Sequence, residues 1–263
     1  MHPVLFKIGS FEMASYGLMT ALAYIAAAWY LYKRLHYIKL DKDTFWNIIF
    51  IAFVSALLGS KLLYILVSWQ EMGATFTERL VYAAKNFRYG FVFFGGAVTA
   101  IVALLIYLKK KKLPVLPTAD FFIVALPIGH AIGRIGCFLA GCCYGKQTHL
   151  PWGVTFTDPH SLVAPQYLGT TPLHPTQLYE VLANLILFFI LQYYYKKPHK
   201  SGTVLAAYLI GYCVIRFVIE FFRGDFRGEY IWGLSPSQLI AVLTIAITLI
   251  AMRFLKKDTP HAG

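Results

Sequence analysis

Long apolar runs alternate with short polar connections along almost the whole chain. Seven of these runs have the roughly 20 residues that a helix needs to cross about 30 Å of hydrocarbon. Helices are expected because an isolated apolar segment must satisfy its backbone hydrogen bonds internally, and the alternating strands of a membrane barrel are not visible. We predict membrane spans at residues 13–32, 45–68, 91–108, 119–140, 178–195, 203–222 and 235–255.

The composition agrees with a membrane protein. Of the 263 residues, 58% are hydrophobic and 14% are charged, and the mean hydropathy is +0.60. These values exclude a water-soluble globule. The formal net charge of +12 lies in short clusters between the apolar runs rather than in one stripe, so we expect no nucleic-acid partner. We predict an all-α, polytopic fold in which residues 1–263 form a single integral membrane domain.

The distribution of Lys and Arg predicts the orientation in the membrane. The connections 33–44, 109–118 and 196–202, together with the C-terminal tail, carry fourteen of these residues, against seven in the connections on the other side. Because cytoplasmic connections are enriched in positive charge, we expect the N-terminus outside and the C-terminus in the cytoplasm. The longest connection, 141–177, is then an extracytoplasmic loop.

A few polar side chains fall inside the predicted spans. Arg134 and Arg216 each cost about 2.5–3.5 kcal/mol on insertion scales, and such charges mark functional sites by default. Glu220 follows Arg216 by one helical turn, so these two share a face. In the predicted orientation these residues, Tyr16 and Tyr212 all lie toward the outer leaflet. A site open to one leaflet favours a lipid-facing enzyme or receptor over a transporter, and arginine suits bidentate contact with a phosphate.

Structural roles for the same residues remain open at the level of sequence. Arg216 and Glu220 can form an ion pair that only links helices. Arg134 has no acidic residue one turn away, but it can pair with Glu180 or Glu220 from another span. The tyrosines suit an aromatic belt at the membrane surface as well as a site.

Cysteines and paired glycines also have more than one interpretation. Cys137, Cys142 and Cys143 do not match a common zinc spacing, so we expect no metal. They suit small packing residues, a vicinal disulfide, or a reactive thiolate near an arginine. Gly95 and Gly96 suit either close helix packing or lipid binding.

Four motifs stand in order along nearly the whole chain. They are Ser15-Tyr16-Gly17-Leu18-Met19, the run from Gly133-Arg134-Ile135-Gly136 to Gly145, the segment His174-Pro175-Thr176-Gln177-Leu178-Tyr179-Glu180, and Tyr212 followed by Arg216-Phe217-Val218-Ile219-Glu220-Phe221-Phe222-Arg223. Together they resemble the signature of the prolipoprotein diacylglyceryl transferase family, the bacterial inner-membrane enzymes that attach a diacylglyceryl group to the lipobox cysteine.

The resemblance implies a multi-pass enzyme of the bacterial cytoplasmic (inner) membrane. It implies transfer of a diacylglyceryl group from phosphatidylglycerol to the cysteine thiol at the signal peptide of a prolipoprotein, with release of glycerol phosphate and no cofactor. From the motifs and the buried polar residues we predict the catalytic residues Tyr16, His130, Arg134, Arg216 and Glu220. The predicted substrate-binding residues are Gly95, Gly96, Arg134, Cys137, Gly145, His174, Tyr212 and Arg223.

The chain departs from the family pattern at four positions. The family has Asn, Asn and Glu where this chain has Cys137, Ala140 and Cys142, and it has a His, its proposed thiol base, where this chain has Phe94. Because phenylalanine cannot accept a proton, we hypothesise that His130, one helical turn before the first arginine, is a substitute base. Two alternatives stay open: a phospholipid-dependent transferase of the same fold with a small thiol or lipid acceptor, and a non-catalytic lipid-binding membrane protein.

Overall fold

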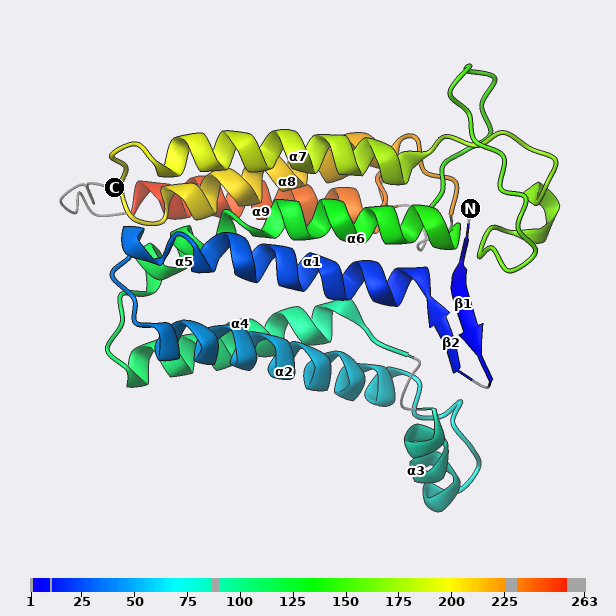
Figure 1. The fold of residues 1–263 in the computed structure, drawn as a ribbon, viewed down its shortest axis with the longest axis horizontal. Helices are drawn as coiled ribbons and strands as arrows, with labels where there is room; N and C mark the ends of the chain where they lie inside the picture. Colours follow the sequence, from blue (N-terminus) through cyan, green and yellow to red (C-terminus); the bar gives the residue numbers. More distant parts are fainter. Residues whose placement is uncertain (1, 10, 87–89, 226–230, 255–263) are drawn as a thin grey trace. The chain divides into compact units, whose positions relative to one another are not determined.

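A computed structural model describes residues 2–9, 11–86, 90–225 and 231–254 of the chain (Figure 1). Long helices dominate it, and a short hairpin precedes them. The elements are β1 (Val4–Ile8), β2 (Phe11–Ala14), α1 (Ser15–Tyr32), η1 (Leu35–Tyr37), α2 (Lys42–Val67), α3 (Phe76–Lys85), α4 (Phe93–Lys110), α5 (Val115–Ile123), α6 (Leu126–Ala140), η2 (Pro165–Tyr167), α7 (Thr176–Tyr195), α8 (Thr203–Glu220) and α9 (Pro236–Arg253).

Among the described residues, six helical segments are long and apolar enough to cross a membrane. They are α2, α4, the consecutive α5 and α6, α7, α8 and α9, and they coincide with six of the seven predicted spans. The other predicted span corresponds to α1, an 18-residue helix whose four tyrosines and one tryptophan make it less hydrophobic. The multi-pass character is therefore confirmed, whereas the seventh span and the orientation stay predictions.

The β-hairpin before α1 corrects the all-α prediction, so the fold is mostly helical rather than wholly so. β1 and β2 pair antiparallel, and Ser15 N donates to Pro3 O at 2.9 Å where the hairpin meets α1. α3 is a short amphipathic helix that lies outside the predicted spans. It begins at a capping box, in which Thr75 and Glu78 each accept a hydrogen bond from the other's backbone N–H.

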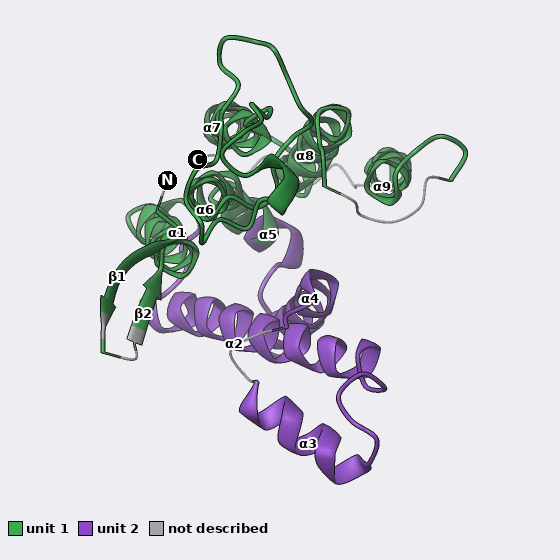
Figure 2. Cartoon of the chain, turned by 90° about the vertical axis from the view of Figure 1, so that its right-hand side faces the viewer, with its two compact units in different colours: residues 1–37, 119–263 green, residues 38–118 purple. Residues whose placement is uncertain are grey.

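The chain divides into two compact units, which Figure 2 colours separately. Unit 1 comprises residues 1–37 and 119–263, and unit 2 comprises residues 38–118. In unit 1, α1 packs on α6, α6 on α7, α7 on α8 and α8 on α9. The start of α1, the end of α6, the start of α7, the end of α8 and the start of α9 therefore share one end of this unit (Figure 1). That a single integral membrane domain covers the whole chain stays a prediction.

Helix starts in unit 1 are fixed by side chains that satisfy free backbone N–H groups. Asp120 of α5 accepts hydrogen bonds from Gly202 N at 2.5 Å and from Leu205 N at 2.7 Å, so a buried carboxylate caps α8. α9 begins with a capping box between Ser235 and Gln238. Both helices thus begin at defined residues, and Asp120 also links the start of α8 to α5.

The connection between α6 and α7 is an ordered loop. Gly141, with φ +75°, ends α6 in the left-handed conformation that favours glycine. Phe156 and Leu173, neither of which is exposed, form the centre of a small apolar cluster within the loop. Gly145 N donates to His174 O at 2.9 Å, which ties the residues after α6 to those before α7. This connection holds the ends of α6 and α7 together.

In unit 2, α2 and α4 pack through small residues. A Cβ atom added to Gly95 would collide with the carbonyl of Gly59, and one added to Gly96 would collide with the Ser60 hydroxyl. Thr99 Oγ1 donates to Ser55 O across the same contact at 2.8 Å. Close helix packing therefore accounts for the two glycines of α4.

Candidate active site

A carboxylate near the start of α7 contacts two arginines. Glu180 is 1% exposed, and its Oε2 lies 2.6 Å from Nε of Arg134 on α6. Its Oε1 accepts a hydrogen bond at 3.2 Å from Nη1 of Arg223, which follows α8. Of the two carboxylates considered as partners for Arg134, the structure therefore selects Glu180. A buried charge is tolerated when it is paired in this way.

Arg134 retains hydrogen-bond donors that no neighbour uses. Its Nε donates to Nε2 of His130, one turn earlier in α6, at 3.2 Å, and lies beside Glu180. Within the described part of the chain these contacts involve Nε alone, so the two Nη groups are not engaged. A pair of parallel N–H donors at the end of a guanidinium matches the geometry of a phosphate.

His130 and Tyr212 lie in the neighbourhood of both predicted arginines. Their ring centroids are 5.2 Å apart, and Tyr212 stacks on Tyr208 with centroids 5.8 Å apart and an interplanar angle of 13°. The rings of His130 and Tyr212 are each within electrostatic reach of Arg134 and of Arg216. The structure thus brings four of the predicted site residues from α6 and α8 together.

Arg216 forms the ion pair that the sequence allows. Its Nη2 lies 2.6 Å from Oε2 of Glu220, and both residues are less than a tenth exposed. The same nitrogen donates to Ser237 Oγ, in the first turn of α9, at 2.9 Å. The pair is therefore fixed between α8 and α9.

Arg223 is buried and its donors face carboxylates. Nε and Nη2 donate to the two carboxylate oxygens of Asp225 at 2.9 and 2.8 Å, while Nη1 donates to Glu180. Burial opposes the charged form, but Asp225 and the neighbouring Cys143 outweigh it and raise the pKa of Arg223 above its ordinary value. These contacts suit a residue that positions Glu180. Its predicted role in binding substrate stays a prediction.

Gly145 and His174 lie where three segments of the chain meet. A Cβ atom on Gly145 would lie 2.5 Å from His174 Cβ and 2.6 Å from Phe222 O, so only glycine fits without a shift. The imidazole Nδ1 of His174 is 3.1 Å from the hydroxyl of Tyr179. These contacts explain both residues structurally, and their predicted part in substrate binding is not tested by them.

Tyr16 lies in the first turn of α1, beside the end of α6. A Cβ atom on Gly136 would lie 3.3 Å from Tyr16 Cα, so the two helices approach closely there. The tyrosine is half exposed, and it is within electrostatic reach of Arg134 and Cys137. The start of α1 thus contributes a hydroxyl to the same end of unit 1.

Gly95 and Gly96, together with Phe94, belong to unit 2. The two glycines are buried against α2, as described above, and Phe94 is 56% exposed. Lys61 of α2 is buried as well, and its ammonium donates to Asn86 O at 3.0 Å. A role for the two glycines in binding substrate stays a prediction.

Three cysteines meet at the end of α6. The sulfur atoms of Cys137, Cys142 and Cys143 all lie within 4.8 Å of one another, and all three thiols are free. Hydrogen bonds from Cys137 and Cys142, together with the adjacent guanidinium of Arg223, lower the pKa of Cys143 below its ordinary value. Hydrogen bonds to Cys137 and Cys143 raise the pKa of Cys142.

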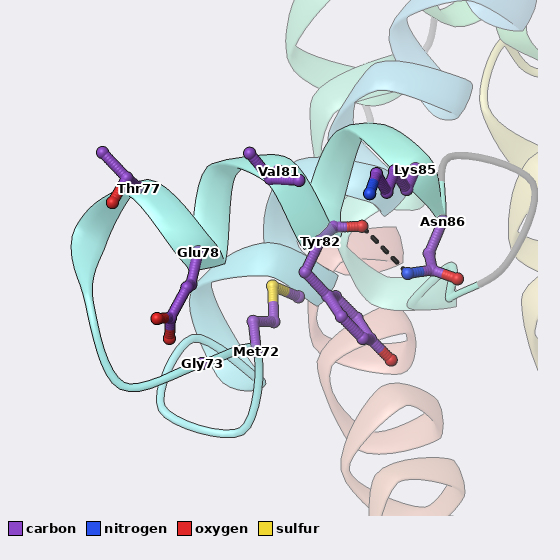
Figure 3. Close-up of a pocket in the computed structure, with 8 residues that line it drawn as sticks. All are labelled: Met72, Gly73, Thr77, Glu78, Val81, Tyr82, Lys85 and Asn86. Carbon is purple, nitrogen blue, oxygen red and sulfur yellow. Dashed lines mark hydrogen bonds between the residues drawn. The ribbon is translucent and has the colours of Figure 1, made fainter.

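A hollow of about 480 Å³ lies at α3 in unit 2 (Figure 3). Its carboxylate, Glu78, accepts hydrogen bonds from the backbone N–H groups of Thr75 and Ala74, which lower its pKa. Asn86 Nδ2 donates to Tyr82 O at 3.0 Å. Because these polar groups serve the two ends of α3, we place the candidate active site in unit 1.

Sequence reasoning did not include three acidic or hydroxyl residues of this site. Glu180 was considered as a partner for Arg134 but not as a site residue, although it is the last residue of the motif that begins at His174. Asp225 lies just beyond the predicted span 203–222, Ser237 lies near the start of the predicted span 235–255, and each contacts an arginine. Their position as polar residues close to span ends is the signal that could have found them.

The fold and site define a multi-pass helical membrane protein with paired arginines and carboxylates at one end of its larger unit. The model of the prolipoprotein diacylglyceryl transferase family matches residues 3–254, so the chain belongs to this family of membrane transferases. The phosphatidylglycerol–prolipoprotein diacylglyceryl transferase of Clostridium tetani is 39% identical over 260 residues, which cover 98% of this chain and 100% of that protein.

Other relatives carry the same name. The enzyme of Pasteurella multocida is 34% identical over 259 residues, covering 95% of this chain and 90% of its own length. A second enzyme of this kind from Clostridium perfringens is 33% identical over 245 residues, covering 93% of this chain and 92% of its own length. The chain therefore spans nearly the full length of its relatives.

Proposed function

We propose that this protein transfers a diacylglyceryl group from phosphatidylglycerol to the lipobox cysteine of prolipoproteins. The names of its relatives give both substrates. We place the protein in the bacterial cytoplasmic membrane with the N-terminus outside, the C-terminus in the cytoplasm and the 141–177 loop outside, in accord with the distribution of Lys and Arg. The signal peptide of the prolipoprotein then approaches from the membrane, and the phospholipid comes from the outer leaflet.

The contacts of Arg134 are the main observation that supports this choice of site. Arg134 is held through Nε by Glu180 and His130, while its Nη groups are not engaged by any described residue. A guanidinium fixed at one side and open at the other is preorganised to receive a phosphate. Arg216, held by Glu220, supplies the second cation in the same neighbourhood.

The proposed reaction is a substitution at the glyceryl carbon that carries the phosphate ester. The sulfur of the acceptor attacks this carbon, the new C–S bond forms as the C–O bond breaks, and the electron pair leaves with glycerol phosphate. Negative charge grows on the leaving phosphate oxygen, so Arg134 and Arg216 lower the barrier by stabilising it more strongly in the transition state than before. Glu220 orients Arg216.

The acceptor thiol must lose a proton before or during the attack, and we assign this step to His130. Its Nε2 accepts a hydrogen bond from Nε of Arg134, so this ring nitrogen offers a lone pair. The Nε–H of Arg134 also faces Glu180, so it can shift from His130 to the carboxylate while the Nη groups bind the phosphate, and the freed lone pair then takes the proton. Substrate binding would in this way prepare the base.

The remaining predicted residues are assigned to binding. The hydroxyls of Tyr16 and Tyr212 are suited to hydrogen bonds with the glycerol headgroup, because both lie in the neighbourhood of Arg134. Further substrate contacts are assigned to Gly95, Gly96, Cys137, Gly145, His174 and Arg223.

The test of this function uses purified protein in vesicles of phosphatidylglycerol labelled in its headgroup and acyl chains, with a synthetic lipobox peptide. We expect a thioether-linked peptide and one glycerol phosphate released for each, and no product with Arg134→Gln. Glycerol phosphate without modified peptide would indicate another acceptor. The absence of both products would identify a non-catalytic lipid-binding protein. Rescue of a bacterial strain depleted of its own transferase is the matching experiment in cells.

A further inference from the structure

The three cysteines at the end of α6 have the geometry of a metal site. Their sulfur atoms lie within 4.8 Å of one another, whereas bonds of about 2.3 Å to a tetrahedral zinc ion place sulfurs roughly 4 Å apart. Small side-chain rotations are enough to close that difference. The sequence spacing concealed this arrangement, because Cys137 is separated from Cys142 and Cys143 by the left-handed turn at Gly141.

The turn that carries two of the sulfurs is built and held from outside. Cys143 has φ +61°, an uncommon conformation for a residue with a side chain. Backbone strain of this kind is found mainly at functional sites. Gln177 Nε2 donates to Cys142 O at 2.7 Å, and Thr176 Oγ1 donates to Cys143 O at 2.8 Å. The first turn of α7 thus fixes the backbone from which both sulfurs project.

The surroundings suit three thiolates and leave a side of the cluster accessible. The guanidinium of Arg223 lies beside Cys143 and offsets negative charge. Cys137 is buried, whereas Cys142 and Cys143 are only partly buried. Cys137 also follows Arg134 by three residues on α6, so the cluster adjoins the proposed phosphate site.

We propose that Cys137, Cys142 and Cys143 bind one Zn²⁺ ion whose fourth coordination position receives the acceptor thiol. Three protein ligands and one open position are the pattern of catalytic zinc sites, and a thiol bound to the metal is deprotonated. The inference rests on the proposed transfer reaction. It stabilises the thiolate that the acceptor forms when its proton passes to His130.

The proton and electron balance is simple. The three cysteine thiols release their protons to solvent when the ion binds, and the acceptor thiol passes its proton to His130 as its sulfur takes the fourth position. The bound sulfur then attacks the glyceryl carbon, and glycerol phosphate leaves with the electron pair of the broken C–O bond. The product thioether is neutral and a weaker ligand, so it dissociates from zinc.

Metal binding is tested with the full chain in detergent, reduced with a phosphine and freed of metal by a chelator. Titration with Co²⁺ is expected to give one ion per chain and a thiolate-to-cobalt charge-transfer absorption, which Zn²⁺ then removes. Cys143→Ser and Cys137→Ser should abolish this absorption. Cys213→Ser, which changes the buried cysteine of α8, is the matched control and should retain it. No charge-transfer absorption in the wild-type chain, or an unchanged one in both site variants, overturns the proposal.

A second measurement needs no variant. Zn²⁺ should slow the reaction of Cys142 and Cys143 with a maleimide at least tenfold in the folded wild-type chain, as followed by mass spectrometry. Equal rates with and without Zn²⁺ overturn the site.

Removing zinc should also lower peptide lipidation at least tenfold, with recovery when Zn²⁺ is restored. Full transfer by the metal-free chain overturns the role in activation. A chain that binds Co²⁺ through the three cysteines but makes no product contradicts the proposed function and not the site.

Discussion

The guanidinium Nε of Arg134 lies 2.6 Å from the carboxylate Oε2 of Glu180, and this contact joins α6 to α7 at the centre of the site. The other oxygen of Glu180 accepts from Arg223, beyond the end of α8. One buried carboxylate therefore determines the positions of two cations from different segments. Several consequences can be measured.

Replacing Glu180 with Gln should both destabilise the protein and impair transfer. Two guanidiniums would lose their shared counter-charge in a buried position, which costs about 3 kcal/mol or more. Thermal unfolding in detergent measures the first effect, and the lipobox peptide assay measures the second. Glu12→Gln is the control, because Lys7 and Glu12 form a pair of the same 2.6 Å length that is exposed on the hairpin. Equal melting temperatures for the two variants would contradict the assignment of Glu180.

Replacing Arg134 with Lys should lower kcat by about 100-fold or more, with a small effect on stability. Lysine keeps the positive charge but cannot pair with Glu180 and present two parallel donors to a phosphate at the same time. Steady-state transfer from labelled phosphatidylglycerol gives kcat and KM separately. A Lys variant with wild-type kcat would show that charge alone is required and that the open Nη groups have no role.

Replacing His130 with Ala separates the base from a positioning role. Loss of a general base should lower kcat about 100-fold or more, and a Gln variant, which still offers an acceptor to Arg134, should be equally impaired. The rate as a function of pH should also lose its acidic limb in both variants. Full activity of purified His130→Ala would disprove the assignment, and recovery in His130→Gln would indicate that the ring only orients Arg134.

Replacing Gly145 with Ala should destabilise the protein by about 1–3 kcal/mol, because the new methyl group meets His174 and the carbonyl of Phe222. The matched variant is Gly133→Ala in α6, where a Cβ atom meets nothing within 4 Å. It should be neutral or slightly stabilising, since alanine favours a helix by about 0.5–1 kcal/mol over glycine. Melting temperatures of both variants decide the matter, and the reverse order would contradict the packing described for the loop.

The membrane spans could be predicted from sequence because hydrophobicity over about 20 residues decides them locally. The pairing of Arg134 could not, because Glu180 and Glu220 were equally allowed until α7 was placed beside α6. The cysteine cluster was missed for a related reason: Gly141 reverses the chain, and residue spacing carries no information on that reversal. The hairpin at residues 4–14 was not predicted, because a short apolar segment beside a span resembles the start of a helix.

The most direct test of the account is the position of the phosphate in a structure of the protein bound to phosphatidylglycerol in a lipid nanodisc. We expect phosphate oxygens within about 3 Å of the Nη groups of Arg134 and within reach of Arg216, with Glu180 still beside Nε of Arg134. A phosphate bound elsewhere on the chain, with Arg134 and Arg216 in contact only with their carboxylates, would contradict the proposed site.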